Sequence, residues 1–217
     1  MLPLPDLFAT LLHAYGPQHW WPGETRLEII VGAVLIQNTN WRNASRAIDN
    51  LALAGLLEWP ALLASDDNTL RACIWPSGFY NVKLRRLRSL LNYLAPWGLE
   101  HPRWLALPLQ TLRAELLAVQ GVGPETADSI LLYAFERPTF VVDAYTRRLL
   151  ARLGADWAQR ASYQALQAHW MAALPSDTAL YNEAHALIVQ HAKTHCRAKP
   201  RCADCPLLTH CPFGSGC

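Results

Sequence analysis

The sequence has no apolar run long enough to cross a membrane, few charged residues, and only one cysteine before its last 22 positions. The longest apolar stretch, Ile29–Ile36, is roughly a third of the length that a membrane span needs. No basic segment followed by an apolar one opens the chain, so we expect no secretory leader, no membrane partner and a cytoplasmic location. Hydrophobic residues make up 52% and charged residues 17%. That composition is too apolar for a disordered chain and sufficient for a sizeable core.

The charge is unevenly distributed along the chain, although the net charge is only +2. Residues 1–70 contain three Lys or Arg against seven Asp or Glu, whereas residues 71–217 contain sixteen against ten. A basic second part suits a polyanionic partner, but the same asymmetry also occurs in proteins that bind no polyanion. Charge alone leaves both interpretations open.

Helical patterns separated by proline and glycine run through nearly the whole chain, without an internal repeat or a low-complexity tract. Residues 29–31 could form a strand, but they lie within the apolar segment 24–37, whose length favours a buried helix. We therefore predict an all-α fold. The other helices are expected over residues 6–15, 43–54, 61–63, 67–74, 81–93, 109–118, 125–135, 144–153, 162–173 and 177–192.

The segment 116–127 contains the most informative local motif. An apolar helix ends, Gly121-Val122-Gly123 makes a tight turn, and a new helix begins with Pro124 at its first position. Glycine tolerates positive φ and lets another molecule approach the backbone, and proline at the first helical position loses no hydrogen bond. The free N–H groups of the second helix favour an anion. The pattern indicates either a helix-hairpin-helix that grips a DNA backbone, or an ordinary turn between two helices.

A single carboxylate, Asp143, follows the three apolar residues 140–142. Such an acid lies at the edge of a core, where it could face a cleft. It also suits the N-cap of the helix expected over residues 144–153. The same side chain can have both roles.

Cysteines are concentrated near the end of the sequence. Four of them follow the spacing Cys-x5-Cys-x2-Cys-x5-Cys: Cys196, Cys202, Cys205 and Cys211. Without a secretory leader a disulfide framework is not expected, so a metal site is the leading interpretation. Four thiolates suit either zinc or an iron–sulfur cluster.

The hairpin followed by Val142-Asp143 resembles the helix-hairpin-helix DNA glycosylases of the endonuclease III superfamily. Residues 35–39, residues 78–83 and the cysteines also match, so the resemblance covers residues 24–212. It implies a base excision repair enzyme that flips a damaged nucleotide out of double-stranded DNA and cuts its N-glycosidic bond. Asp143 matches the family's essential aspartate, which would stabilise an oxocarbenium-like sugar and help a water attack C1′.

The resemblance also bears on strand cleavage and on the cofactor. Bifunctional members have a lysine in the second hairpin helix, where this sequence has Glu125. A carboxylate cannot form an imine, so we predict a monofunctional glycosylase with Glu125 near the base pocket. The cysteine spacing is one residue shorter in its first gap than the family pattern for a [4Fe–4S] cluster. The resemblance therefore favours that cluster, with zinc as the alternative.

Three tryptophans bear on the substrate. Trp20-Trp21-Pro22, followed by Trp41 after Gln-Asn-Thr-Asn, is similar to the 3-methyladenine DNA glycosylases of the endonuclease-III-like branch. There the matching aromatic rings stack around the flipped alkylated base. A 3- or 7-methylated purine nucleotide is cationic and is attracted to electron-rich ring faces. We predict alkylated purines as substrates, although burial of area would equally explain each ring.

Other substrates stay open, because the best-known members of that branch lack the cysteine ligands. A mismatch glycosylase that removes uracil or thymine is the nearest rival, and an adenine glycosylase is a weaker one. A non-catalytic module that binds DNA lesions would use the hairpin equally well, but would leave Asp143 and the aromatic rings without a role. An electron-transfer protein would leave the hairpin unexplained.

The resemblance also implies DNA contacts. Gln37 matches a polar residue that fills the gap left by the flipped nucleotide, and Phe79 matches an apolar wedge that enters the base stack. The hairpin would hold the DNA backbone through Gly121, Val122 and Gly123. Apart from the resemblance, Lys83 belongs to a run of basic residues on the helix expected over residues 81–93, and we expect it on the DNA face. The alternatives are a polar helix end, a core phenylalanine and a solvated helix face.

We expect two lobes and a monomer that acts on nucleoid DNA. The first lobe is a helical barrel over residues 23–134, with the helix-hairpin-helix at about 111–134. The second lobe combines residues 1–22 with 135–217 and contains the cysteine loop, 196–211.

Overall fold

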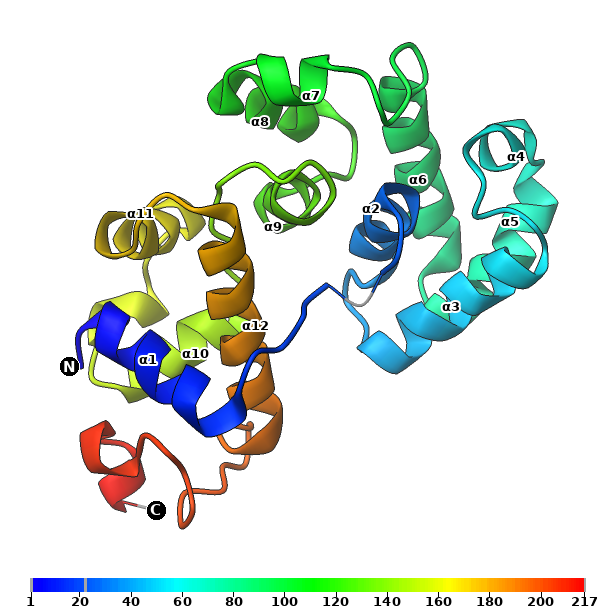
Figure 1. The fold of residues 1–217 in the computed structure, drawn as a ribbon. Coiled ribbons are helices and arrows are strands. Elements are labelled where there is room, and N and C mark those ends of the chain that lie inside the picture. Colours follow the sequence, from blue (N-terminus) through cyan, green and yellow to red (C-terminus); the bar gives the residue numbers. More distant parts are fainter. Residues whose placement is uncertain (1, 22, 217) are drawn as a thin grey trace. The chain divides into compact units, whose positions relative to one another are not determined.

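The computed structural model describes residues 2–21 and 23–216, and within these ranges it contains helices and turns but no strand (Figure 1). The all-α prediction is confirmed. The α-helices are α1 (Leu4–Tyr15), α2 (Arg26–Leu35), α3 (Trp41–Leu53), α4 (Trp59–Ala64), α5 (Asp67–Ile74), α6 (Tyr80–Leu94), α7 (Arg103–Ala106), α8 (Leu109–Ala118), α9 (Pro124–Ser129), α10 (Ala144–Arg152), α11 (Tyr163–Ala173) and α12 (Thr178–Thr194).

The chain divides into two compact units. Unit 1 combines Met1–Trp21 with Pro138–Cys217, and unit 2 is Pro22–Arg137. Unit 2 is built around α2, which packs against α3, α6, α9 and the following turn of π-helix. Seven of the ten residues of α2 are buried, because its sequence is apolar on nearly every side.

Unit 1 is organised around α12, which packs against α1 and α10 (Figure 1). A stack of aromatic rings fills its core. Phe140 and Trp170 lie parallel with their centroids 4.7 Å apart, and the rings of Tyr181 and Phe140 are nearly perpendicular, with centroids 5.8 Å apart. This packing holds the segment that leads into Asp143, because Phe140, Val141 and Val142 are all buried.

Side-chain caps explain where many helices begin. A polar residue immediately before each helix accepts a hydrogen bond from a backbone N–H of the first turn, which has no partner within the helix. These caps are Thr25 for α2, Asn40 for α3, Asp66 for α5, Ser162 for α11 and Asp177 for α12.

The helix expected over 125–135 is not a single α-helix. The α9 helix ends at Ser129, and Ile130–Ala134 continue it as a π-helix. All five of these π-helical residues are buried, so packing stabilises a geometry that is rare in isolation. Among the helices of the described residues, none is both long and apolar enough to cross a membrane.

Candidate functional site

Asp143 is the N-cap of α10 and part of a capping box. Its Oδ1 atom accepts hydrogen bonds from the backbone N–H and the hydroxyl of Thr146, at 2.7 and 2.9 Å. Its Oδ2 atom lies 3.6 Å from Nε2 of His185, which projects from α12. The side chain is 13% exposed, so the carboxylate lies at the edge of the unit 1 core and is not sealed inside it.

The surroundings of Asp143 keep it ionised. Burial alone raises the pKa of the carboxyl, but the His185 ring and the hydrogen bonds from Thr146 outweigh it and hold the pKa below its ordinary value. The start of α10 adds the positive end of the helix dipole. The carboxylate is therefore a fixed negative charge at neutral pH.

His185 is a site residue that sequence reasoning missed. It is 5% exposed and lies on the buried side of α12, with its ring nearly perpendicular to that of Phe140 and the centroids 6.5 Å apart. The sequence contained one usable signal: position 185 falls among the buried apolar residues of α12. A histidine on such a face usually has a polar partner.

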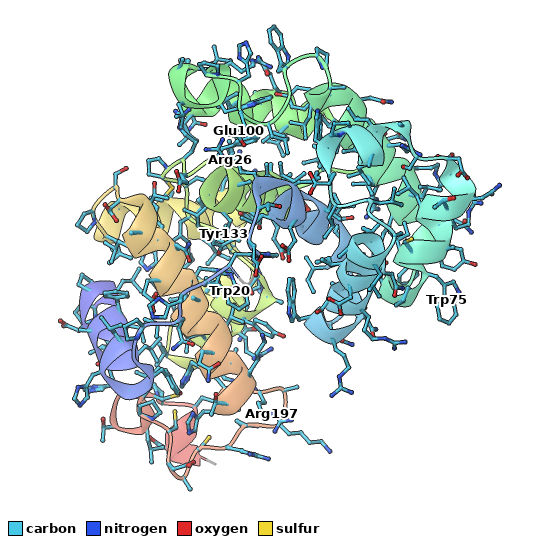
Figure 2. The ribbon with its side chains drawn as sticks, turned by 45° about the vertical axis from the view of Figure 1, so that its right-hand side comes forward. Trp20, Arg26, Trp75, Glu100, Tyr133 and Arg197 are labelled. Carbon is cyan, nitrogen blue, oxygen red and sulfur yellow. The ribbon has the colours of Figure 1, made fainter. Side chains whose placement is uncertain are left out.

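Trp20 and Trp21 contact each other in unit 1, with their ring centroids 5.6 Å apart and their planes inclined at 72°. The ammonium of Lys193, on α12, lies 5.3 Å from the centroid of Trp20. Glu183 anchors this segment to α12, because its Oε1 atom accepts the backbone N–H of Gln18 at 2.7 Å. Trp20 is drawn with its neighbours in Figure 2.

Burial lowers the pKa of Lys193, and the negative charge of Asp143 partly offsets that effect. A carboxylate, a cation and a pair of indole rings therefore belong to one neighbourhood of unit 1. Of the sequence predictions, Asp143, Trp20 and Trp21 fall in this unit, whereas Lys193 was not among them.

The predicted hairpin is present in unit 2, with Pro124 at the first position of α9. Gly121 has a φ of +86°, and a Cβ atom there would overlap the Arg86 side chain. Only glycine suits both conditions. Gly123 differs, because its φ is −92° and no atom lies within 4 Å of where its Cβ would be. It is exposed, so it leaves open space beside the backbone.

Val122 corrects one part of the hairpin prediction. Its side chain is 5% exposed and belongs to the hydrophobic core, and its N–H donates to the Val119 carbonyl at 3.1 Å. Neither group is available to DNA.

An ion pair connects the two helices of the hairpin. Arg113 on α8 donates to both carboxylate oxygens of Asp128 on α9, at 2.8 and 3.0 Å. The hairpin is therefore a rigid element.

Gln37 joins the end of α2 to the hairpin. Its Nε2 atom donates to the Gly121 carbonyl at 3.2 Å and to the Thr126 hydroxyl at 2.9 Å, and its Oε1 atom accepts from Arg86 at 2.5 Å. The structure thus brings Gln37 and Gly121 together. Sequence reasoning did not identify Arg86 or Thr126 as their partners.

The prediction that Lys83 lies on a DNA-binding face is wrong. Lys83 is 1% exposed, and its Nζ atom donates to the carbonyls of Leu35 and Ser77 at 2.8 and 2.6 Å. Burial, with a smaller contribution from the charge of Arg86, lowers its pKa to about 8. The lysine lies on the inward face of α6, among leucines, and satisfies two buried carbonyls.

The three other predicted residues of unit 2 have different surroundings. Phe79 is 69% exposed and adopts a left-handed backbone conformation, with φ +46°, immediately before α6. Trp41 begins α3 and packs partly buried against the core of unit 2. Glu125, in the first turn of α9, is exposed.

All four predicted cysteine ligands line one cavity in unit 1, together with Arg152 and His191. Nη1 of Arg152 donates to the Cys196 sulfur at 3.3 Å, and the N–H of Gly214 donates to the Cys211 sulfur at 3.4 Å. In the described part of the chain, no three His, Cys, Asp or Glu side chains are grouped as ligands of a metal ion. The four cysteines thus share a cavity, with hydrogen-bond donors directed at two of the sulfurs, but their side chains are not gathered around one point.

The comparisons with known proteins agree with this geometry. Residues 31–175 match the model of the HhH-GPD superfamily of base excision DNA repair proteins. Methanocaldococcus jannaschii protein MJ1434, named provisionally as a DNA repair glycosylase, is 45% identical over 207 residues, 94% of each chain. Endonuclease III of Sulfolobus acidocaldarius is 27% identical over 195 residues, which cover 88% of this chain and 84% of that protein.

Solved structures show the same fold. The crystal structure of the Helicobacter pylori 3-methyladenine DNA glycosylase bound to 1,N6-ethenoadenine matches with a TM-score of 0.75 and 27% identity, over 88% of this chain and 98% of that one. A non-covalent endonuclease III–DNA complex matches with a TM-score of 0.81 and 22% identity, over 100% and 98%.

The chain thus belongs to the HhH-GPD superfamily of base excision DNA repair proteins. The family expectation from the sequence, a helix-hairpin-helix DNA glycosylase of the endonuclease III superfamily, is confirmed.

Proposed function

We propose that this protein is a monofunctional DNA glycosylase that releases alkylated purines, such as 3-methyladenine, from double-stranded DNA. The observation that carries the proposal is the carboxylate of Asp143, which Thr146 and His185 keep ionised at the edge of unit 1. We further propose that the protein acts as a monomer on the DNA of the cytoplasm.

Asp143 would act by charge and not by a covalent bond. Breaking the N-glycosidic bond leaves positive charge on the deoxyribose, and a fixed carboxylate stabilises that charge in the transition state. The Oδ1 atom is committed to the helix cap, so Oδ2 is the oxygen that would face the sugar or orient a water for attack at C1′.

The absence of strand cleavage follows from Glu125. An imine with C1′ requires an amine, and the exposed side chain at this position of α9 is a carboxylate. We propose that Glu125 has no covalent role, and that Trp20 and Trp21 of unit 1 contact the base.

The substrate class is supported by the Trp20 ring, which already lies against a cation, the Lys193 ammonium. The contact shows that this ring face attracts a cation, and a methylated purine carries a positive charge that a normal base lacks. The base would take the place of the ammonium against the ring. The match to the H. pylori enzyme, whose name specifies 3-methyladenine, points to the same substrates.

DNA would be held by unit 2 through three features. The Gly123 turn leaves its backbone open to a phosphate, Gln37 would fill the gap left by the flipped nucleotide, and the exposed Phe79 would enter the base stack as a wedge. Gly121 supports the turn from within, since its carbonyl is bonded to Gln37.

We propose that the cavity of unit 1 binds a [4Fe–4S] cluster through Cys196, Cys202, Cys205 and Cys211. The donor set fits, because four thiol side chains line one space and N–H groups are directed at two sulfurs, as they commonly are around such clusters. A bound cluster would cross-link the loop over residues 196–211. Zinc is the alternative ligand.

Base release from methylated duplex DNA tests the function, with the products separated by chromatography and uracil, mismatch and oxidised-pyrimidine duplexes assayed in parallel. Release of 3-methyladenine, without covalent trapping by borohydride, is the expected result. Excision confined to uracil or mismatched thymine would identify a mismatch glycosylase. Binding without release of any base would identify a lesion-binding module.

A further inference from the structure

A second candidate binding site lies in unit 2, in a groove between α3, α5 and the start of α6. Six of the residues that line it have polar or aromatic side chains. They supply two guanidinium groups, two carboxamides and two aromatic rings: Arg46, Arg71, Asn50, Asn68, Trp75 and Tyr80. Among the described residues that line this groove, none is an aspartate or a glutamate. None of these residues has a place in the function proposed above.

The two arginines give the groove its positive charge. Arg46 on α3 is exposed and makes no hydrogen bond or ion pair with any residue that the structure describes. Arg71 donates to the side-chain oxygens of Asn81 and Asn68, at 3.0 and 2.7 Å. These amides are neutral, so they orient the guanidinium without cancelling its charge. Such a group is prepared to bind an anion.

The rim of the groove contains a tryptophan, Trp75, whose ring is largely exposed to solvent. Trp75 is 61% exposed, and its side chain points away from the helices (Figure 2). Phe79, four residues later, is 69% exposed. The segment over residues 75–79 therefore presents two large rings to solvent, and one of them, Trp75, lines the groove together with the two arginines. Stacking rings next to a positive groove are the features with which proteins bind an unpaired nucleic acid strand.

We propose that this groove binds the DNA strand opposite the damaged nucleotide, with phosphates on Arg46 and Arg71 and a base stacked on Trp75. The proposal rests on the DNA-repair function, because it takes Phe79 as the wedge that enters the duplex. Tyr80 of the groove adjoins that wedge in sequence, so the unstacked bases next to the wedge are those closest to the groove. A stacking platform there offsets the free energy that unstacking costs.

The occupant follows from charge and shape. A DNA strand supplies phosphates for both guanidinium groups and a flat ring for the indole, and the lining offers no negative charge to oppose it. An acidic peptide would satisfy the arginines but would leave Trp75 exposed. The groove would thus distinguish double-stranded from single-stranded substrates, because only a duplex has a second strand.

The test uses the full-length protein and an oligonucleotide that contains a tetrahydrofuran abasic analogue. The same strand is used single-stranded and in a duplex with 2-aminopurine opposite the analogue. The variants are Trp75→Ala, Trp75→Phe and Arg46→Ala. Trp97→Ala and Arg85→Ala are the matched controls, because both residues are exposed in unit 2 and lie outside the groove.

Trp75→Ala should weaken duplex binding by about 5- to 100-fold and abolish the quenching of 2-aminopurine, whereas Trp75→Phe should keep most of both. Arg46→Ala should reduce the slope of log affinity against log salt by about one. In every variant the single-strand affinity should fall by clearly less than the duplex affinity. These readouts do not depend on which base is excised, so they are separate from the proposed substrate.

Duplex affinity and quenching equal to those of the two controls would overturn the groove proposal and leave the glycosylase function intact. Equal losses on single-stranded and duplex DNA would also overturn it, since the groove would then contact the damaged strand. Failure of the wild-type protein to bind the duplex would overturn both proposals.

Discussion

The Nε2 atom of His185 lies 3.6 Å from Oδ2 of Asp143, while both hydrogen bonds of the α10 cap go to Oδ1. The two oxygens of one carboxylate therefore have separate partners. One oxygen fixes the position of the side chain, and the other is available for chemistry under the influence of a buried histidine. This division allows stability and activity to be tested separately.

Asp143→Asn should reduce base release by roughly 100- to 1000-fold, because the neutral amide cannot stabilise a developing positive charge. Asparagine is as good an N-cap as aspartate, so the free energy of unfolding should change by less than about 1 kcal/mol. Single-turnover release and denaturant unfolding measure the two effects. An unchanged rate would exclude Asp143 as the catalytic carboxylate.

Replacing His185 should shift the pH profile. Below the pKa of Asp143 the carboxyl becomes neutral and activity is lost, and the His185 ring holds that pKa below its ordinary value. In His185→Gln only the Thr146 hydrogen bonds oppose the effect of burial, so the pKa of Asp143 should rise. The acid limb should then move to higher pH, and the rate at pH 5 should fall relative to pH 7. His13→Gln, an exposed change on α1, serves as the control. A parallel drop at every pH would indicate a structural role only.

Substitution of the two hairpin glycines by alanine should have different effects on the free energy of unfolding. Gly121→Ala forces a left-handed residue and a clash with Arg86, so it should destabilise unit 2 by about 2 kcal/mol or more. Gly123→Ala has room for its methyl group, and its stability should change by less than about 0.5 kcal/mol. If phosphate approaches at this turn, Gly123→Ala should still weaken DNA affinity. Thermal unfolding and gel-shift titration separate the two cases.

Lys83→Met should destabilise the protein by about 1–3 kcal/mol at pH 7, because it leaves the Leu35 and Ser77 carbonyls without their donor. In the folded wild-type chain the pKa of Lys83 is about 8, below the ordinary 10.5. Between these two pH values the unfolded chain therefore binds more protons than the folded chain. The stabilisation that Lys83 provides should therefore increase from pH 8 to 10.5. Urea unfolding of both proteins across this range measures it, and a loss of DNA affinity with unchanged stability would contradict the assignment.

Cys205→Ser should remove the iron, the brown colour and the absorbance near 400 nm if the cavity holds a [4Fe–4S] cluster. Cys73→Ser is the control, because Cys73 is the one cysteine of the described residues that does not line the cavity. Elemental analysis provides the measurement. Stoichiometric zinc in the wild-type protein would exclude the cluster.

Much of the fold could be predicted from local signals. The α8 helix has the bounds expected from the sequence, and α5 does as well, because proline or a capping residue marks their starts. The short α7 was missed because four residues carry no periodicity, and its start at Arg103 depends on packing around Trp104. The π-helical continuation of α9 was also missed, since tertiary packing determines it.

The candidate site was predictable where one residue type suits only one role. Asp143 as a cap and Pro124 at a helix start are such cases. Lys83 was wrongly assigned to a DNA-binding face because a lysine in a run of basic residues is expected to point outward, whereas only the fold shows that it donates to two buried carbonyls. His185 was missed because its partner is 42 positions away in the sequence.

The buried ammonium of Lys83 has a mechanical consequence. It ties the end of α2, two residues before Gln37, to the 75–77 turn, two residues before Phe79. The two side chains that we propose to enter a distorted duplex, Gln37 and Phe79, thus project from backbone segments that one ammonium group connects. Moving either backbone segment away from the other would stretch these hydrogen bonds, so the distance between the two segments is fixed before DNA binds.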